Sequence, residues 1–154
     1  MANSFSSNLN IAKPAAGDLN WENEYDDFVE AVDDIGNLLT MNVPVPGNAV
    51  DEAVVFDGYT PQEDITVVAI GIFAKTAPTD ANLTIDVLKD GAELGDLATL
   101  TAASIFEKTT LAAPQDILKT ERLGLKIKQI GSTVAGADLI VTIYFKKKAI
   151  ASST

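Results

Sequence analysis

Four pairs of adjacent acidic residues are the side chains best suited to bind a metal ion or to work together as an acid and a base. The pairs are Asp26-Asp27, Asp33-Asp34, Asp51-Glu52 and Glu63-Asp64. The first two lie in a predicted helix, where adjacent side chains point about 100° apart and cannot converge on one ion. The other two lie in predicted turns and could join a calcium site from loops, although no EF-hand spacing is present. We therefore assign no catalytic, cofactor-binding or metal-binding residue.

The chain lacks two of the residue types that usually carry out nucleophilic catalysis. The 154 residues include no cysteine and no histidine, so the chain has no thiolate, no soft metal ligand and no imidazole base. The glycine-flanked segment Gly131–Gly136 would cradle a phosphate only between a strand and a helix, usually with a lysine. Strands are predicted on both of its sides, and we interpret it as a hairpin loop. We expect a protein that is not an enzyme and that needs no cofactor.

An apolar seam runs through an acidic segment near the N-terminus. Its residues follow one another in steps of 4, 3, 4, 3 and 4, the a/d spacing of a heptad helix. From Asp18 to Asp34 there are eight carboxylates and no basic residue, so such a helix needs its seam buried against another surface. We predict that the seam forms a trimer or anchor interface, made of Trp21, Tyr25, Phe28, Val32, Ile35 and Leu39.

Two further groups leave alternatives open. Trp21, the only tryptophan, could stack on a sugar, but at the head of the seam it is better placed as a packing anchor. The run Lys146-Lys147-Lys148 could dock an acidic surface, such as the acidic helix of a neighbouring copy, or it could protect a strand end.

The net charge of −11 is concentrated in the first part of the chain. Residues 1–65 hold thirteen acids and one base, whereas residues 66–154 hold nine acids and ten bases. Sequence-independent binding to nucleic acid needs basic residues that neutralise phosphates, and anionic membrane surfaces attract the same residues. We therefore expect no nucleic-acid partner and no membrane partner, and an acidic region suited to a basic protein surface.

The elements that must position these residues divide the chain into five parts. We predict an extended N-terminal arm over 1–20, an acidic amphipathic helix over 21–40, a linker with two prolines over 41–50, a β-sandwich domain over 51–148 and a C-terminal tail over 149–154. Asn20 is the expected N-cap of the helix.

About seven short strands are predicted in the β domain, from apolar alternation and Gly, Pro or Asp turns. Ile65–Lys75 is apolar on both faces, so we expect the core to cover one face and a neighbouring subunit to cover the other. Asp90-Gly91 is a hairpin signal. The pattern predicts a mainly β fold, an antiparallel sandwich of the jelly-roll kind. The other predicted strands lie near residues 53–56, 83–88, 98–101, 105–110, 123–127 and 139–145.

Two stretches resemble proteins of tailed-bacteriophage particles. The segment Ile11–Trp21, which reads Ile-Ala-Lys-Pro-Ala-Ala-Gly-Asp-Leu-Asn-Trp before the acidic helix, resembles an N-terminal motif of phage fibre and virion proteins. The run Ile70–Gly91 looks like β-sandwich domains of phage fibres and capsid decoration proteins, with Asp80 where glycine is usual. The resemblance implies a trimeric virion component and brings no catalytic residues.

These observations lead to two functional hypotheses. The first is a non-enzymatic bacteriophage virion structural protein. It would be a trimeric capsid decoration, head-fibre or neck component, anchored through its N-terminal arm and helix to other virion proteins such as the major capsid, neck or tail proteins. The second is a receptor- or carbohydrate-binding module of a tail fibre. Both place the protein in the virion, assembled in the host cytoplasm.

Overall fold

The computed structural model describes residues 38–148, which form eight β-strands. The predicted arm, nearly all of the predicted helix and the C-terminal tail lie outside the described residues. Within residues 38–148 there is no helix of the length and apolarity needed to cross a membrane. The strands are β1 (Leu38–Asn48), β2 (Val54–Tyr59), β3 (Ile65–Thr76), β4 (Leu83–Lys89), β5 (Ala92–Leu100), β6 (Phe106–Ile117), β7 (Leu123–Gln129) and β8 (Ala137–Lys147).

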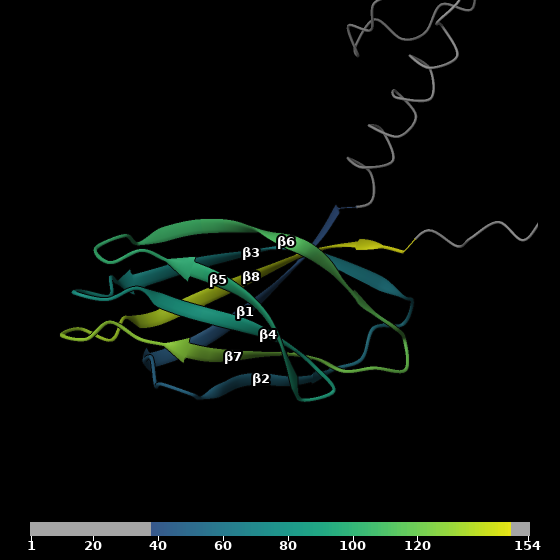
Figure 1. The fold of residues 1–154 in the computed structure, drawn as a ribbon, viewed down its shortest axis with the longest axis horizontal. Coiled ribbons are helices and arrows are strands. Elements are labelled where there is room, and N and C mark those ends of the chain that lie inside the picture. Colours follow the sequence, from purple (N-terminus) through teal and green to yellow (C-terminus); the bar gives the residue numbers. More distant parts are fainter. Residues whose placement is uncertain (1–37, 149–154) are drawn as a thin grey trace, which may run out of the picture. The chain divides into compact units, whose positions relative to one another are not determined.

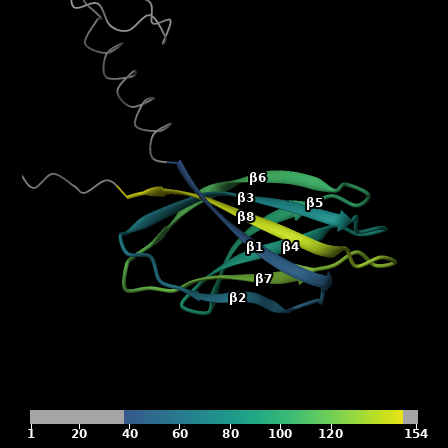
Figure 2. The ribbon, with the colours of Figure 1, turned by 180° about the vertical axis from the view of Figure 1, so that it is seen from behind.

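Two four-stranded sheets pack face to face. Sheet A has the strand order β1-β8-β3-β6, and sheet B has the order β2-β7-β4-β5. Every pairing is antiparallel. Figure 1 shows sheet B toward the viewer, and Figure 2 shows sheet A from the opposite side. The prediction of a mainly β, antiparallel sandwich is confirmed.

The core lies between the sheets, because alternate residues of each strand point inward. In β8, for example, Leu139, Val141, Ile143 and Phe145 are buried, and the residues between them face away from the core. The core cluster comprises Val43, Ala49, Ile65, Val67, Ile70, Ile72, Ala74, Leu83, Ile85, Val87, Ala98, Leu100, Leu111, Ile117, Leu123, Leu125, Ile127, Leu139, Val141, Ile143 and Phe145.

The turn at Asp90-Gly91 joins β4 and β5 as predicted. Lys89 pairs with Ala92, so the turn has two residues, and both have positive φ, 52° and 82°. This is the backbone of a type I′ turn, which suits the right-handed twist of a hairpin. β4 and β5 are the only consecutive strands among β1–β8 that share a sheet. The chain crosses from one sheet to the other at each of the remaining connections.

Strand β1 corrects the predicted boundaries. Residues 38–40 were expected at the end of the helix and residues 41–50 in the linker, but Leu38–Asn48 is a strand paired with β8. The reason is a period-two alternation in which Met41, Val43 and Val45 pack on the core. Pro44 is tolerated because β1 is an edge strand, where a missing backbone N–H costs little.

The segment between β7 and β8 is an arch between the sheets, since β7 belongs to sheet B and β8 to sheet A. The expected strands flank it, but the predicted hairpin is wrong. The backbone N–H of Thr79 donates to the carbonyl of Val134 at 3.0 Å, which ties the arch to the β3–β4 connection. Asp80, at the position where the resemblance expects glycine, adopts a glycine-like φ of 63°.

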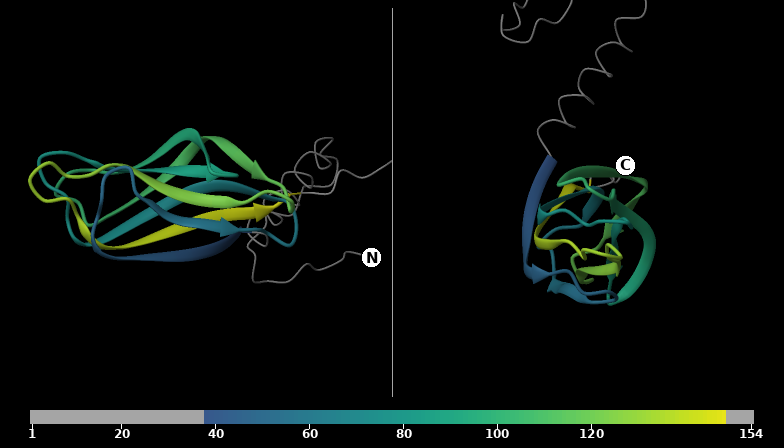
Figure 3. Two further views of the ribbon diagram at one scale, coloured as in Figure 1. Left: turned by 90° about the horizontal axis from the view of Figure 1, so that it is seen from below. Right: turned by 90° about the vertical axis from the view of Figure 1, so that its left-hand side faces the viewer.

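The connections gather at the two ends of the sandwich (Figure 3). Leu38 pairs with Lys146, so β1 begins and β8 ends at the same end, which we call the proximal end. The segments 49–53, 77–82, 101–105 and 130–136 lie at the opposite, distal end. Backbone hydrogen bonds link these segments, from Ala49 to Gly136 at 2.8 Å and from Ala103 to Pro78 at 2.7 Å.

Candidate interaction surface

The predicted interface falls almost wholly outside the described residues. Trp21, Tyr25, Phe28, Val32 and Ile35 all precede residue 38. Leu39 is described, and it lies in β1 opposite Phe145 with 41% of its surface exposed. The described residues therefore offer two other candidates, the outer faces of the two sheets.

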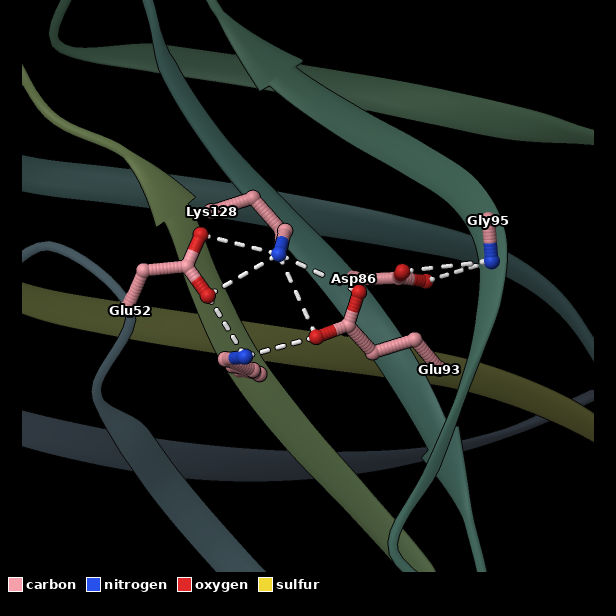
Figure 4. Close-up of polar contacts among 6 residues, drawn as sticks. Glu52, Asp86, Glu93, Gly95 and Lys128 are labelled. Carbon is pink, nitrogen blue, oxygen red and sulfur yellow. Dashed lines mark hydrogen bonds and ion pairs between the residues drawn. The ribbon is translucent and has the colours of Figure 1, made fainter.

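The outer face of sheet B carries four interleaved charges, which we call the ion-pair cluster: Glu52, Glu93, Lys126 and Lys128 (Figure 4). Lys126 Nζ lies 2.6 Å from Glu52 Oε2 and 2.6 Å from Glu93 Oε1. Lys128 Nζ lies 2.8 Å from Glu52 Oε1 and 3.1 Å from Glu93 Oε2. Each charge thus has two opposite neighbours, and such a network contributes more than an isolated surface pair.

Hydrogen bonds from Lys126, followed by those from Lys128, hold the pKa of Glu52 and of Glu93 below the usual 4.5. The same contacts raise the pKa of both lysines. Every group is therefore firmly in its charged form near neutral pH, and none is poised to exchange a proton. A cluster saturated in this way suits a structural role rather than acid–base catalysis.

The buried carboxylate of Asp86 lies on the same sheet face and is 1% exposed. Both of its oxygens accept the backbone N–H of Gly95 at 3.1 Å (Figure 4). The register of β4 and β5 shifts between Asp86 and Leu88, so Asp86 holds the irregular part of β5 in place. Its role is structural, because the contact satisfies a backbone donor.

Glu63-Asp64, the second acidic pair that was predicted to lie in a turn, also makes polar contacts within the chain. Glu63 Oε2 lies 2.9 Å from Lys147 Nζ, and Asp64 Oδ1 accepts the backbone N–H of Lys119 at 2.9 Å. Lys148 pairs with Asp116. Within residues 38–148, no three or more carboxylates gather where they could hold a metal ion.

Acid should weaken the sandwich through the ion-pair cluster. Because Glu52 and Glu93 have lowered pKa values in the folded chain, their contribution is present above about pH 4.5 and is lost as pH falls through the folded values. The melting temperature should therefore fall as the pH drops below about 4.5. In Glu52→Gln/Glu93→Gln this fall should be smaller.

The matched control is Glu63→Gln, which removes one carboxylate of an isolated pair that is 62% and 54% exposed. It should leave the pH profile close to that of the wild type. Circular-dichroism melts at half-unit pH steps make the comparison. Identical profiles for the double variant and the wild type would contradict a stabilising cluster.

The outer face of sheet A is different, because an apolar row crosses all four of its strands. The register places Pro44 opposite Ile140, Ile140 opposite Phe73, and Phe73 opposite Phe106. Ile140, Phe73 and Phe106 are exposed by 42%, 39% and 55%. Each strand contributes one residue, so the row is a property of the assembled sheet.

The neighbouring row, which the register makes Asn42, Thr142, Gly71 and Lys108, is shaped by Gly71. A Cβ added at Gly71 would lie 3.3 Å from Cε2 of Tyr144 and 3.7 Å from Cε2 of Phe106, so the missing side chain lets both rings lie close to the sheet. Lys108 Nζ lies 4.0 Å from the centroid of the Tyr144 ring, a cation–π contact. Both rows lie on the outward side of sheet A, which we call the sheet A outer face.

An antiparallel sheet that faces water normally has a polar outer side. Sheet B follows this rule with its ion-pair cluster, whereas the sheet A outer face departs from it along the apolar row. The sequence alone indicated that Ile65–Lys75 is apolar on both faces. Ile140 and Phe106 were not identified as its neighbours, because their alignment with Phe73 depends on long-range register.

A scan against models of protein families found no match to this chain, and neither did a search of curated proteins.

Proposed function

We propose that this chain is a non-enzymatic bacteriophage virion structural protein, a trimeric capsid decoration, head-fibre or neck component anchored through its N-terminal arm and helix. The sequence support is the resemblance of Ile11–Trp21 and Ile70–Gly91 to phage virion proteins. The saturated charges of the ion-pair cluster are compatible with a structural role.

The observation that carries the proposal is the pattern of strand pairs. β1 pairs with β8, β2 with β7, β3 with β6, and β4 with β5. This is the pattern expected when one long antiparallel ribbon, closed at the β4–β5 hairpin, is folded over to make two sheets. It supports assignment to the jelly-roll class, which recurs in viral capsid and lectin domains. Since a fold alone does not give a function, the proposal joins it to the sequence resemblance.

The second candidate is a receptor- or carbohydrate-binding module of a tail fibre. The observation that favours it is the distal end, where four hydrogen-bonded connections lie opposite the end at which β1 begins and β8 ends. Loops held on a rigid scaffold are frequent binding sites. Binding of the full chain to immobilised host glycans or to host cells would favour this candidate over the first.

Purified virions of the phage that encodes this chain should contain it, in copy numbers divisible by three. Mass spectrometry of purified particles detects the chain, and a density map gives its position and copy number. Absence from the particles would contradict the proposal. The map also separates decoration, head-fibre and neck positions.

Trp21→Ala should weaken attachment to particles. A fully packed indole buries roughly 150–250 Å2, and truncation costs about 3–5 kcal/mol. The test is binding of labelled chain to particles that lack it, with Trp21→Phe as the control that keeps an aromatic ring. If the acidic segment steers attachment to a basic surface, wild-type binding should also weaken as salt rises past about 0.15 M. Equal binding by all three proteins at every salt concentration would contradict anchoring through the arm.

A further inference from the structure

We propose that the sheet A outer face is the surface through which copies of this chain contact one another. This inference rests on the proposed trimeric assembly and names the surface that forms it. The row Pro44, Ile140, Phe73 and Phe106 is its centre, and the occupant is a second copy of the same chain.

The acidic group beside the row, Asp138, has a basic neighbour in the same chain. Lys75 Nζ lies 3.9 Å from Asp138 Oδ2, and Lys108 lies over the ring of Tyr144. A partner that covers this face therefore leaves no acidic side chain buried without a basic neighbour. A surface of this kind fits an apolar partner rather than a strongly charged one, and its own copy is such a partner.

The area of the face is sufficient for a stable contact. Four strands spaced about 4.8 Å apart span roughly 19 Å, and the 11 residues of β8 extend about 37 Å at roughly 3.4 Å per residue. The product is about 700 Å2 for one copy. A standard interface buries about 800 Å2 per partner, so covering most of this face accounts for one.

Three copies close around an axis without leaving a channel. Sheets that pack face to face lie about 10 Å apart, so each lies about 5 Å from the plane between them. Three sheets, each roughly 19 Å wide, joined as a triangular prism lie about 5.5 Å from the central axis by simple geometry. The side chains of the row then fill the centre, and the cyclic symmetry closes the assembly at three copies.

The test is light scattering on the full chain from about 1 to 100 μM. Ile140→Lys places a charge on the sheet A outer face, and Leu97→Lys is the matched control, because Leu97 is 44% exposed on the outer face of sheet B, opposite Asp86. Wild type and Leu97→Lys should have the trimer mass. Ile140→Lys should need at least about 100-fold higher concentration to assemble, since three buried lysines meet near the axis.

Thiol cross-linking provides a second measurement that does not depend on a disruptive variant. The chain has no cysteine, so Phe106→Cys and Leu97→Cys each carry one thiol. A flexible bismaleimide should join copies of Phe106→Cys and leave Leu97→Cys as single chains.

Three outcomes would overturn the inference. In the first, Ile140→Lys assembles as the wild type does. The trimer interface would then lie on another surface, and the proposed function would not be contradicted. In the second, the wild type is a monomer at 100 μM although virions contain the chain. In the third, the thiol of Phe106→Cys is protected from labelling in a monomer, which would mean that the same chain covers the face.

Discussion

A chain that lacks residues 1–36 is expected to melt cooperatively, whereas one that lacks residues 1–48 is expected to form no stable native state. The second deletion removes β1, which pairs with β8 at nine register positions. It also removes Val43 from the core, together with Met41 and Val45, which are partly buried against it. Full burial of one such side chain contributes about 1.5–3 kcal/mol, so one buried and two partly buried side chains are a large part of the roughly 5–15 kcal/mol that stabilises a domain.

The longer deletion has a second cost. β8 would become an edge strand, with unpaired backbone groups beside Leu139, Val141 and Ile143, and such an edge promotes aggregation. Urea melts followed by far-UV circular dichroism, with size-exclusion chromatography, compare the two deletions. Cooperative melts of equal midpoint would contradict a structural role for β1.

Gly131→Ala is expected to destabilise the sandwich by at least about 3 kcal/mol. A Cβ at this position would lie 1.9 Å from the carbonyl oxygen of Val134 and 2.7 Å from the backbone nitrogen of Thr79. Both atoms belong to backbone, and they are hydrogen-bonded to each other at 3.0 Å. The methyl group would therefore have to separate the β3–β4 connection from the β7–β8 arch, because neither can yield as a flexible side chain would.

Ser132→Ala is the control for Gly131→Ala. Ser132 is exposed in the same arch, and its substitution should change the free energy of unfolding by no more than about 0.5 kcal/mol. Chemical denaturation of both variants and the wild type gives the comparison. If Gly131→Ala unfolds at the same urea concentration as the wild type, the arch rearranges at little cost. The contact between the arch and the β3–β4 connection would then contribute little to stability.

Local pattern was enough to predict most strands. Residues 139–145 alternate between buried and more exposed side chains, and Leu123, Leu125 and Ile127 lie in the core at every second position. The Asp90-Gly91 signal needs only its own two residues. β1 was missed because Leu39 also continues the helical seam, while Pro44 and Pro46 resemble a linker. In the structure, pairing with β8 decides this segment, and that pairing joins residues about a hundred positions apart.

The surface features depended even more on distant pairing. In the ion-pair cluster, Lys126 and Glu93 are 33 positions apart in sequence, and Lys128 and Glu52 are 76 apart. No local motif relates such residues. The apolar row likewise needs the register of four strands, so the sequence indicated only its β3 member. The seam residues that precede residue 38 remain a prediction.

The pairing of Leu38 with Lys146 gives the sandwich a mechanical polarity. A pull that separates the start of β1 from the end of β8 acts on one end of an antiparallel ladder. The pull therefore breaks the hydrogen-bonded pairs one after another. The force needed at each step is the force that breaks a single pair. A tether at only one of these two ends transmits no such load. A sandwich held through one end of its chain can therefore be dragged or jolted while its sheets stay closed, whereas one held through both would open at low force.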